Sequence, residues 1–381
     1  MIYMDNGATS LPKPPQVAEA MLYYMTQIGV NVNRGVYGPA QEAELRVLSL
    51  RERLCRLFHF PDPSHAVLTP GMTFGMNQLL KGLLQPGDHC LVSAVEHNAV
   101  MRPLHQLRTR GVSFSRLPCD REGRLDPDAI EACITPNTRL LVMAHASNVA
   151  GTVQDARRVG EICAAHGIFF ALDAAQTAGH YPIDFTALHL SALAAPGHKG
   201  LLGPAGTGIL LLSAELAAAL EPLVSGGTGS VSDSEIPPEF MPDRFEAGTP
   251  NLPGLFGLEA ALAWIEEQTV ARLHAHERAL TARFLANIDG LDGLRLAGSK
   301  RLDERVGVIS LDFLGRDNAE VAFRLEQEYG ILTRCGMHCA PAAHKALGTF
   351  PQGVVRFCPG AFTTEAEIDE TCAAITAILR G

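Results

Sequence analysis

The sequence predicts an α/β protein with two parts: a large domain whose mostly parallel mixed sheet is flanked by helices, and a smaller α+β domain at the C-terminus. Short apolar runs alternate with amphipathic stretches between Ala66 and Leu212, a pattern typical of β-α-β units. A Gly-, Ser- and Pro-rich segment, Ser225–Pro250, interrupts the pattern. Long helical stretches follow it and lead into a region of mixed strands and helices.

The expected strands of the large domain are short, nearly continuous apolar runs, as in sheets that are covered on both faces. These runs are Ala66–Leu68, Cys90–Val95, Leu140–Ala144, Ile168–Leu172, Ser191–Ala195 and Gly208–Leu212. The helices expected between them are Thr73–Leu84, Asn98–Arg110, Asp126–Ile134 and Asp155–His166.

The C-terminal third begins with a helical region, Leu255–Ala286, for which we expect a break near Thr269. Thr364 and Glu367 fit a capping box at the start of the last helix. We expect a large domain over residues 16–258, a small domain over 259–381, and an N-terminal segment, residues 1–15, that packs with the small domain. The remaining elements expected there are strands at Val306–Phe313, Ile331–Cys335 and Val354–Phe357, and helices at Asn318–Tyr329 and Glu365–Leu379.

Composition excludes several classes of protein. The 31 basic and 41 acidic residues give a net charge of -10, which argues against a general nucleic-acid or anionic-membrane surface. The most apolar stretch, Ile209–Leu223, is interrupted by Glu215 and Glu221 and is too short to span a membrane. The N-terminus reaches Asp5 without a basic segment, and the nine cysteines are scattered. We therefore expect reduced thiols in a cytoplasmic protein.

Polar residues follow the apolar runs of the large domain. They are Thr69 to Thr73, then Glu96 and His97, then His145, Ser147 and Asn148, then Asp173 and Gln176, and finally His198 and Lys199. The carboxyl ends of parallel strands share one edge of an open sheet, where ligands bind. Five separate runs thus deliver polar groups to one place.

Gly71, Met72 and Thr73 end a run and open a helix. Gly allows close backbone approach, and a helix N-terminus offers free N–H groups at its positive end, which suits a phosphate. Taken alone, this motif is better explained as a plain strand-to-helix turn.

Lys199 and Asp173 end neighbouring runs. Lys bonds covalently to aldehydes, and a buried carboxylate needs a cationic partner. Each residue alone is better explained by a solvated charge or a salt bridge. Together with the phosphate-type turn, they match the needs of pyridoxal phosphate. His97 is suited to stack on a ring or to move protons. Asn148 and Gln176 are suited to bind a ring hydroxyl. All three residue types are also common in ordinary loops and turns.

A Gly- and Pro-flanked loop in the C-terminal part carries Cys339 beside His338. Such a loop is suited to an exposed thiolate, and an inert cysteine is an equally good explanation. A metal site is a weaker alternative, because the spacing is not a standard zinc pattern; it would use Cys335, His338, Cys339 and His344. Arg356 ends an apolar run and suits a carboxylate clamp or a surface ion pair.

The sequence resembles the cysteine desulfurases, fold type I pyridoxal phosphate enzymes related to class V aminotransferases. The resemblance runs from Met4 to Phe362, with motifs in the family's order. They are Met4–Ser10, Asn33–Gly35, Gly71–Thr73, Glu96–Asn98, Ser147–Val149, Asp173–Gln176, Gly197–Lys199, Arg244–Asn251, Arg334–Cys339 and Arg356. Pro196, Met72 and Met337 depart from residues common in the family.

The resemblance implies a large domain that binds pyridoxal 5'-phosphate and a role for each matched residue. Lys199 is expected to hold the cofactor covalently, Asp173 to pair with its ring nitrogen, and His97 to stack on its ring. Gly71, Met72, Thr73 and His198 are expected at the phosphate, and Gln176 and Asn148 at the ring hydroxyl. Arg356, Asn148 and Arg34 are expected to bind the substrate carboxylate, and Cys339 to accept sulfur.

The resemblance also implies partners. L-cysteine is the expected substrate, and a homodimer is expected to share its sites through Thr249, which would reach the phosphate of the other subunit. The compact loop at Cys339 resembles the branch that works with a separate sulfur-acceptor protein, and iron–sulfur cluster assembly is the expected destination of the sulfur. No metal, nucleic acid or membrane partner is expected.

Several alternatives remain open at this stage. A selenocysteine lyase or another C–S lyase would use the same scaffold. An aminotransferase has no need of the Cys339 loop, and a non-catalytic sulfur carrier or scaffold has no need of Lys199 with Asp173. A nicotinamide enzyme is disfavoured because no G-x-G-x-x-G follows the first run, where only Gly71 and Gly75 stand.

Overall fold

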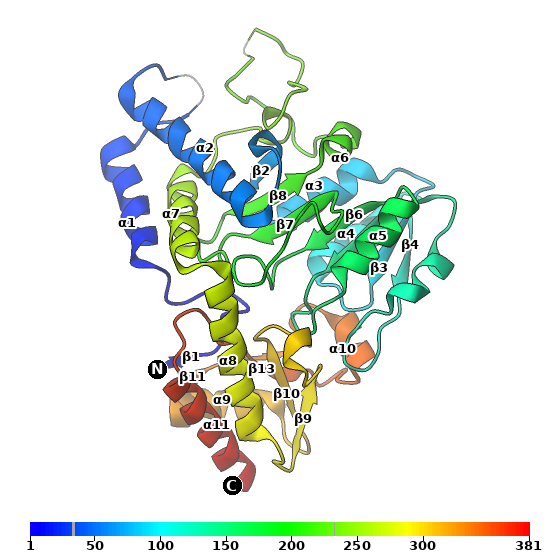
Figure 1. Ribbon diagram of the computed structural model, residues 1–381, viewed down its shortest axis with the longest axis vertical. Coiled ribbons are helices and arrows are strands. Elements are labelled where there is room, and N and C mark those ends of the chain that lie inside the picture. The colour runs from blue at the N-terminus through cyan, green and yellow to red at the C-terminus, as the bar shows by residue number, and fades with distance from the viewer. Residues whose placement is uncertain (33–34, 232) are drawn as a thin grey trace.

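The computed structural model describes residues 1–32, 35–231 and 233–381. Its main feature is a seven-stranded sheet in the order β2-β8-β7-β6-β5-β3-β4 (Figure 1). The strands are β2 (Ala66–Thr69), β3 (His89–Ser93), β4 (Ser113–Leu117), β5 (Thr138–Ala144), β6 (Phe169–Asp173), β7 (Ala192–Pro196) and β8 (Gly208–Leu212).

The strand directions bring the carboxyl ends of six strands to one edge of the sheet. β3, β4, β5, β6 and β7 run parallel to one another. β8 is antiparallel both to β7 and to β2, so the two reversals restore the direction and β2 runs the same way as β7. The α/β class with a mostly parallel mixed sheet is therefore confirmed.

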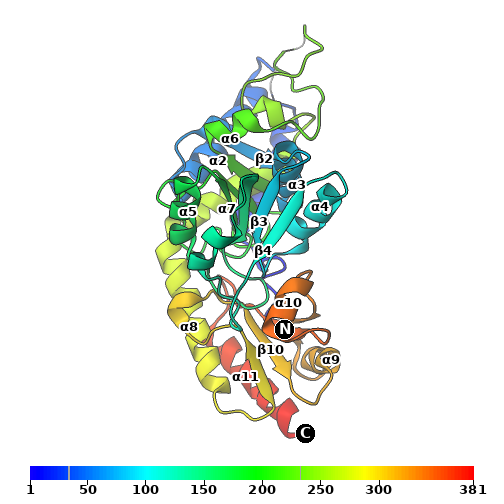
Figure 2. The ribbon, with the colours of Figure 1, turned by 90° about the vertical axis from the view of Figure 1, so that its right-hand side faces the viewer.

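Helices cover both faces of this sheet (Figure 2), and alternate strand residues point to opposite faces. One face packs against α2 (Gly38–Phe58), α5 (Ala156–Ala165) and α7 (Leu252–Gln268). The other packs against α3 (Met72–Leu83), α4 (Asn98–Arg108) and α6 (Ala214–Ala219). Because both faces are buried, the strands are apolar throughout rather than alternating.

The C-terminal part is an antiparallel four-stranded sheet in the order β12-β13-β10-β9. Its core is shared with three helices, α8, α9 and α11. The elements are α8 (Val270–Ile288), β9 (Leu294–Ala297), β10 (Ile309–Phe313), α9 (Asn318–Tyr329), β11 (Ile331–Leu332), β12 (Arg334–Gly336), α10 (Pro341–Leu347), β13 (Val354–Phe357) and α11 (Glu365–Arg380).

The capping box expected at the last helix is present. The Thr364 side chain accepts from the backbone N–H of Glu367, and the Glu367 side chain accepts from the backbone N–H of Thr364. These reciprocal hydrogen bonds satisfy N–H groups that the first turn of a helix leaves unpaired. The predicted helix break is also confirmed, since Thr269 ends α7 and caps α8 with a φ of 63°.

The N-terminal strand β1 (Ile2–Tyr3) pairs in parallel with β11 of the C-terminal part. The helix α1 (Pro15–Tyr23) instead packs on α7. The expected boundary at residue 258 falls inside α7, which also packs on α2 of the large part. We therefore propose Thr269, between α7 and α8, as the boundary of the small domain.

Two local predictions were wrong, and one strand of the large sheet was not predicted. The segment Asp126–Ile134 forms two short 3-10 turns, Pro127–Ala129 and Glu131–Cys133, instead of a helix. Strand β4 was missed because it is a sheet edge, where polar residues alternate with apolar ones. The expected strand at 331–335 is two strands in different sheets, β11 and β12.

The long Gly-, Ser- and Pro-rich segment extends from the large part beside α2 and α6 (Figure 1). Over its described residues it contains one short 3-10 turn, Asp243–Phe245. Among the helices that the structure describes, none combines the length and apolar character needed to cross a bilayer.

Candidate active site

A cavity of about 400 Å³ opens at the carboxyl edge of the large sheet. Its lining comes from the ends of β2, β3, β5, β6 and β7 and from the turns that follow them. Nine residues singled out in the sequence line it: Gly71, Met72, Thr73, His97, Asn148, Asp173, Gln176, His198 and Lys199. The convergence expected from the strand ends is therefore present in the structure.

The N-terminus of α3 forms one wall of the cavity. Gly71 caps this helix with a φ of 155°, which L side chains rarely adopt. Met72 and Thr73 follow in the first turn and line the cavity. Backbone N–H groups at the start of a helix have no partner within the helix. This wall can therefore hold an anion such as a phosphate.

Asp173 ends β6 and is buried. Its Oδ1 accepts a hydrogen bond from the Ala175 N–H at 2.9 Å. Burial raises the pKa of Asp173 to about 6, against the lowering effects of this hydrogen bond and of Lys199. The carboxyl group is therefore largely ionised at neutral pH, and it can hold a cationic ring nitrogen in the cavity.

Lys199 follows β7 and lies close enough to Asp173 for the two charges to interact. Burial lowers the pKa of Lys199 to about 8, although Asp173 opposes the change. A desolvated amine of this kind is partly neutral near neutral pH, which makes it a nucleophile and a base.

The peptide before Lys199 is clamped by the N-terminal segment. The carbonyl of His198 accepts hydrogen bonds from the Ser10 N–H at 3.0 Å, from Thr9 Oγ1 at 3.1 Å and from Ser10 Oγ at 3.2 Å. Lys13 Nζ lies 3.4 Å from the same oxygen. These bonds fix the loop that carries Lys199.

His97 caps α4, and its Nδ1 accepts a hydrogen bond from the Ala99 N–H at 3.0 Å. Burial, with nearby Lys199, Arg356 and Arg102, lowers the pKa of His97 to about 4. The imidazole is therefore neutral at neutral pH. Because Nδ1 is an acceptor, the ring proton is on Nε2.

Cys339 lies in the loop between β12 and α10, and it is exposed. His338 and Cys339 both have left-handed backbone conformations, with φ of 45° and 56°, which L residues adopt only when the surroundings hold them there. Asn148 Nδ2 donates to the His338 carbonyl at 2.8 Å, and the Asn98 N–H donates to the Cys339 carbonyl at 2.8 Å. The loop is thereby held at the rim of the cavity.

Arg356 is buried in β13 next to Asn148. Its Nη1 donates to the Asn148 carbonyl at 3.2 Å, and its Nη2 donates to Asp5 Oδ1 at 2.9 Å. Arg334 donates to Asp5 Oδ2 at 2.9 Å. Asp5 was not predicted as a site residue, and its only signal in the sequence is its place in the motif Met4–Ser10.

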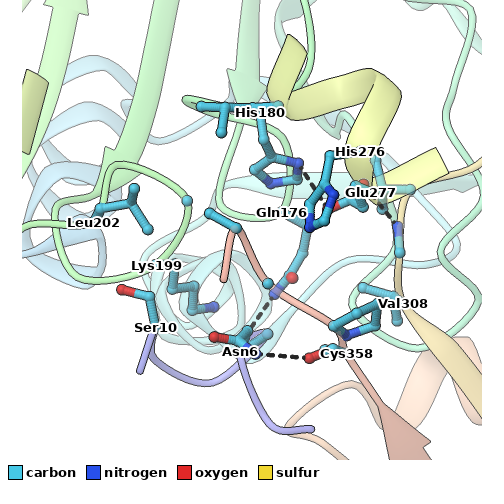
Figure 3. A pocket seen from close by; sticks show the side chains of 18 of the residues that line it. Asn6, Ser10, Gln176, His180, Lys199, Leu202, His276, Glu277, Val308 and Cys358 are labelled. Atoms are coloured by element: carbon cyan, nitrogen blue, oxygen red, sulfur yellow. Dashed lines mark hydrogen bonds and ion pairs between the residues drawn. The ribbon is translucent and has the colours of Figure 1, made fainter. Parts of the chain in front are cut away.

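A second, smaller pocket of about 60 Å³ is also lined by Lys199 (Figure 3). Gln176 lines both pockets, and its Nε2 donates to the Gly7 carbonyl at 3.1 Å. His180 and Glu277 form an ion pair of 3.0 Å in this pocket. That pair joins the turn after β6 to α8, so it links the two parts of the chain.

Three expected site residues, Thr249, Cys339 and Arg356, do not line the cavity. Thr249 is exposed in the segment before α7, and Arg34 lies outside the described residues. Cys339 and Arg356 lie next to the cavity, because Asn148, which lines it, donates to the His338 carbonyl and accepts from Arg356. Among the residues that the structure describes, no group of three His, Cys, Asp or Glu side chains is arranged to hold a metal ion. Cys335, His338, Cys339 and His344 form no such group.

Comparison with known proteins defines the class. The family model "Aminotransferase class-V" matches residues 2–371, so the chain belongs to the class-V aminotransferase family. Within it, the chain is 32% identical to the cysteine desulfurase CsdA of Escherichia coli, over 97% of this chain and 91% of that protein. It is also 32% identical to a cysteine desulfurase of Cronobacter sakazakii, over 100% and 94%.

A solved structure agrees with these matches. The apo structure of cysteine desulfurase from Thermococcus onnurineus superposes with a TM-score of 0.93 at 31% identity, covering 100% of this chain and 95% of that one. Class-V family members of this kind are pyridoxal phosphate-dependent enzymes.

The residues of the cavity fit this cofactor. Lys199 supplies a buried amine, Asp173 supplies a carboxylate for the ring nitrogen, and the start of α3 with His198 supplies an anion site. All of them line one cavity, whose volume lies within the range of small-molecule sites.

Proposed function

We propose that the chain is a cysteine desulfurase, which converts L-cysteine to L-alanine and moves the sulfur through Cys339 to an acceptor. The observation that carries this proposal is the position of Cys339. Its exposed thiol lies in a loop that Asn148 and Asn98 tie to the cavity containing Lys199. Cysteine desulfurases among the relatives support the same activity.

Pyridoxal phosphate, when bound to Lys199, supplies the electron-withdrawing group that makes the substrate Cα–H bond acidic. Asp173 holds a positive charge at the ring nitrogen, and its predominant ionisation at neutral pH supports this role. The α3 N-terminus and His198 would hold the phosphate. His97, which lines the same cavity, would contact the ring, with its Nε2–H available to donate.

Arg356 binds the substrate carboxylate, with Asn148 beside it and Arg34 as a further contact. The guanidinium has five N–H donors, and Asn148 and Asp5 use two of them. Donors therefore remain for a carboxylate. The charge of Asp5 keeps the buried guanidinium compensated when no substrate is bound.

The reaction needs a base and a nucleophile. The lowered pKa of Lys199 supports its role as the base that removes the Cα proton. The Cys339 thiolate attacks the substrate sulfur. The bond between that sulfur and the substrate Cβ breaks, and a sulfur–sulfur bond forms on Cys339. The carbon fragment takes up one proton at Cβ, regains at Cα the proton that Lys199 removed, and leaves as L-alanine, while the persulfide carries sulfane sulfur.

We propose that a second copy of the chain completes the site. Thr249 is exposed and does not line the cavity of its own chain, which supports a role in the partner's cavity. Exposed apolar side chains of the α1 and α2 region, including Leu22, Met25 and Leu45, support a self-association surface.

A separate sulfur-acceptor protein takes the persulfide sulfur, since Cys339 is accessible from outside. Iron–sulfur cluster assembly is the proposed destination of this sulfur. All nine cysteines are free thiols, which supports function in the reducing cytoplasm.

The test compares two cysteine substitutions in the holoenzyme. Cys339→Ser should keep the bound cofactor and lower alanine formation from cysteine by on the order of 10³-fold or more, because the nucleophile is lost. Cys335→Ser, four residues away in β12, serves as the matched control. Full activity in Cys339→Ser would refute the assignment. Parallel assays with selenocysteine separate a desulfurase from a selenocysteine lyase, since a lyase of that kind would turn over selenocysteine only.

A further inference from the structure

Glu96 is a fully buried carboxyl group that the proposed mechanism does not use. It follows β3 and immediately precedes His97, the cap of α4. It does not line the cavity, whereas Asp173 does. The chain therefore holds two buried carboxyl groups at the same edge of the sheet, one facing the cavity and one behind it.

The hydrogen bonds of Glu96 distinguish its two oxygens. Oε1 accepts from Ser93 Oγ at 2.5 Å and from the Ala144 N–H at 2.7 Å. Ser93 Oγ itself accepts from the Val95 N–H at 3.3 Å, so its hydroxyl proton is free to point at Glu96. Oε2 is buried and has no hydrogen-bond partner among the described residues. An ionised carboxylate would place negative charge on Oε2 with no donor to stabilise it, whereas a protonated carboxyl group places no full charge there.

The position of Asp173 argues against a second negative charge. Ala144, which donates to Glu96, stands opposite Asp173 in the pairing of β5 with β6. Two neighbouring buried carboxyl groups do not both ionise readily, because like charges repel strongly away from water. Asp173 lies near the Lys199 amine and faces the cavity, while no cation is paired with Glu96 among the described residues.

We propose that Glu96 is an un-ionised carboxylic acid, which fastens the turn carrying His97 to the end of β5 and leaves Asp173 as the single negative charge of the pair. Glu96 is thus a positioning residue that touches neither substrate nor cofactor. The role of Asp173 in this statement rests on the proposed function, but the protonation of Glu96 can be measured independently of it.

The electrostatic surroundings agree with this assignment. Burial, and then the charge of Asp173, raise the pKa of Glu96 from 4.5 to about 8. The other titratable neighbour from β3 is Cys90, whose thiol is held neutral by a pKa that burial raises. His97 and His145 border the two ends that Glu96 joins, and burial lowers the pKa of each to about 4, so both are neutral.

The first test needs no variant. The full chain, loaded with pyridoxal phosphate and labelled with ¹³C at its glutamate carboxyl carbons, is examined by infrared spectroscopy at neutral pH. A carboxylic-acid C=O band that shifts with the label is expected, because the label separates glutamate from aspartate. A spectrum in which labelled carbon contributes only carboxylate bands would overturn the proposal.

Substitutions then assign the band and the role. Glu96→Gln reproduces the shape and neutrality of the acid, so it should abolish the labelled acid band and keep the cofactor absorbance spectrum and its pH dependence. Glu96→Ala removes the acceptor for Ala144 and Ser93, so it should alter that spectrum. Asp173→Asn is the matched control, in which amide replacement of the other carboxyl group should disrupt cofactor binding. If Glu96→Gln is as damaging as Asp173→Asn, Glu96 acts as an anion and the proposal is wrong.

The pH dependence of stability gives a second readout. The folded chain keeps the Glu96 proton between pH 4.5 and about 8, while the unfolded chain releases it. Glu96 therefore contributes stability that is lost as the pH rises through this window, so the unfolding free energy of the wild type should fall relative to that of Glu96→Gln as the pH rises. Equal slopes would contradict the proposal. Failure of the wild type to form alanine from cysteine would instead refute the proposed function and leave the infrared result intact.

Discussion

Asp5 Oδ1 accepts a hydrogen bond from Arg356 Nη2 at 2.9 Å, and both side chains are buried. The other carboxylate oxygen of Asp5 accepts from Arg334, at the start of the strand that leads to Cys339. The pairing of β1 with β11 brings Asp5 to this position. The N-terminal segment therefore connects the proposed substrate clamp with the segment that leads to the nucleophile.

Replacing Asp5 with Asn should weaken both stability and substrate binding. Removing one partner of a buried ion pair leaves the other charge uncompensated, which costs about 3–5 kcal/mol of unfolding free energy. The KM for cysteine should rise by about tenfold, equivalent to about 1.4 kcal/mol, as Arg356 loses its fixed orientation. Denaturant unfolding and steady-state kinetics measure the two effects.

The matched control for Asp5 is Asp369→Asn, which breaks the exposed ion pair with Arg283. An exposed pair contributes little to stability because water and salt screen it. Equal unfolding free energies and equal KM values for cysteine in the two variants would contradict the proposed role of Asp5.

Asn148→Ala removes the hydrogen bond that holds the His338 carbonyl. The Cys339 loop should then move from its reactive position, and misplacement of a nucleophile by about 1 Å slows a reaction by on the order of 10²-fold. Single-turnover measurement of sulfur transfer to Cys339, compared with cofactor absorbance, separates loop position from cofactor binding.

Asn287→Ala is the control for Asn148, because it removes an exposed side-chain bond to Asp369 in the small domain. Unchanged sulfur transfer in Asn148→Ala would show that the loop does not depend on this bond.

The pKa of Lys199, lowered by burial to about 8, sets the pH dependence of cofactor attachment. Only the neutral amine attacks an aldehyde, so the rate at which the cofactor-free chain binds pyridoxal phosphate covalently should rise with pH and level off above about 8. An ordinary lysine titrates near about 10.4. Stopped-flow absorbance measures the rate, and Lys199→Ala should form no covalent linkage. A rate still rising at about pH 10 would contradict the lowered pKa.

Those parts of the site whose positions depend on the local sequence pattern could be predicted from the sequence. Asp173 and Lys199 end apolar runs, and parallel strands bring such ends together whatever the loops do. The break at Thr269 and the cap at Thr364 were likewise predictable, because helix ends depend on nearby residues.

Features that depend on contacts between residues far apart in the sequence could not be predicted. Asp5 and Arg356 form an ion pair although they are 351 positions apart in the sequence. No local sequence pattern predicts such a pair. Glu96 was visible only as part of a motif, since its protonation depends on burial and on Asp173. The segment Asp126–Ile134 fails as a helix because a stretch this short needs an apolar face to pack, and neither of its 3-10 turns contains a buried residue.

The most direct test of the central claim follows sulfur onto one side chain. The purified chain, loaded with pyridoxal phosphate, is incubated with L-cysteine, and its peptides are analysed by mass spectrometry while alanine is measured. One added sulfur on the peptide containing Cys339, with alanine formed in matching amount in the first turnover, is the predicted result. Alanine formed with the sulfur on another cysteine, or no alanine at all, would contradict the account.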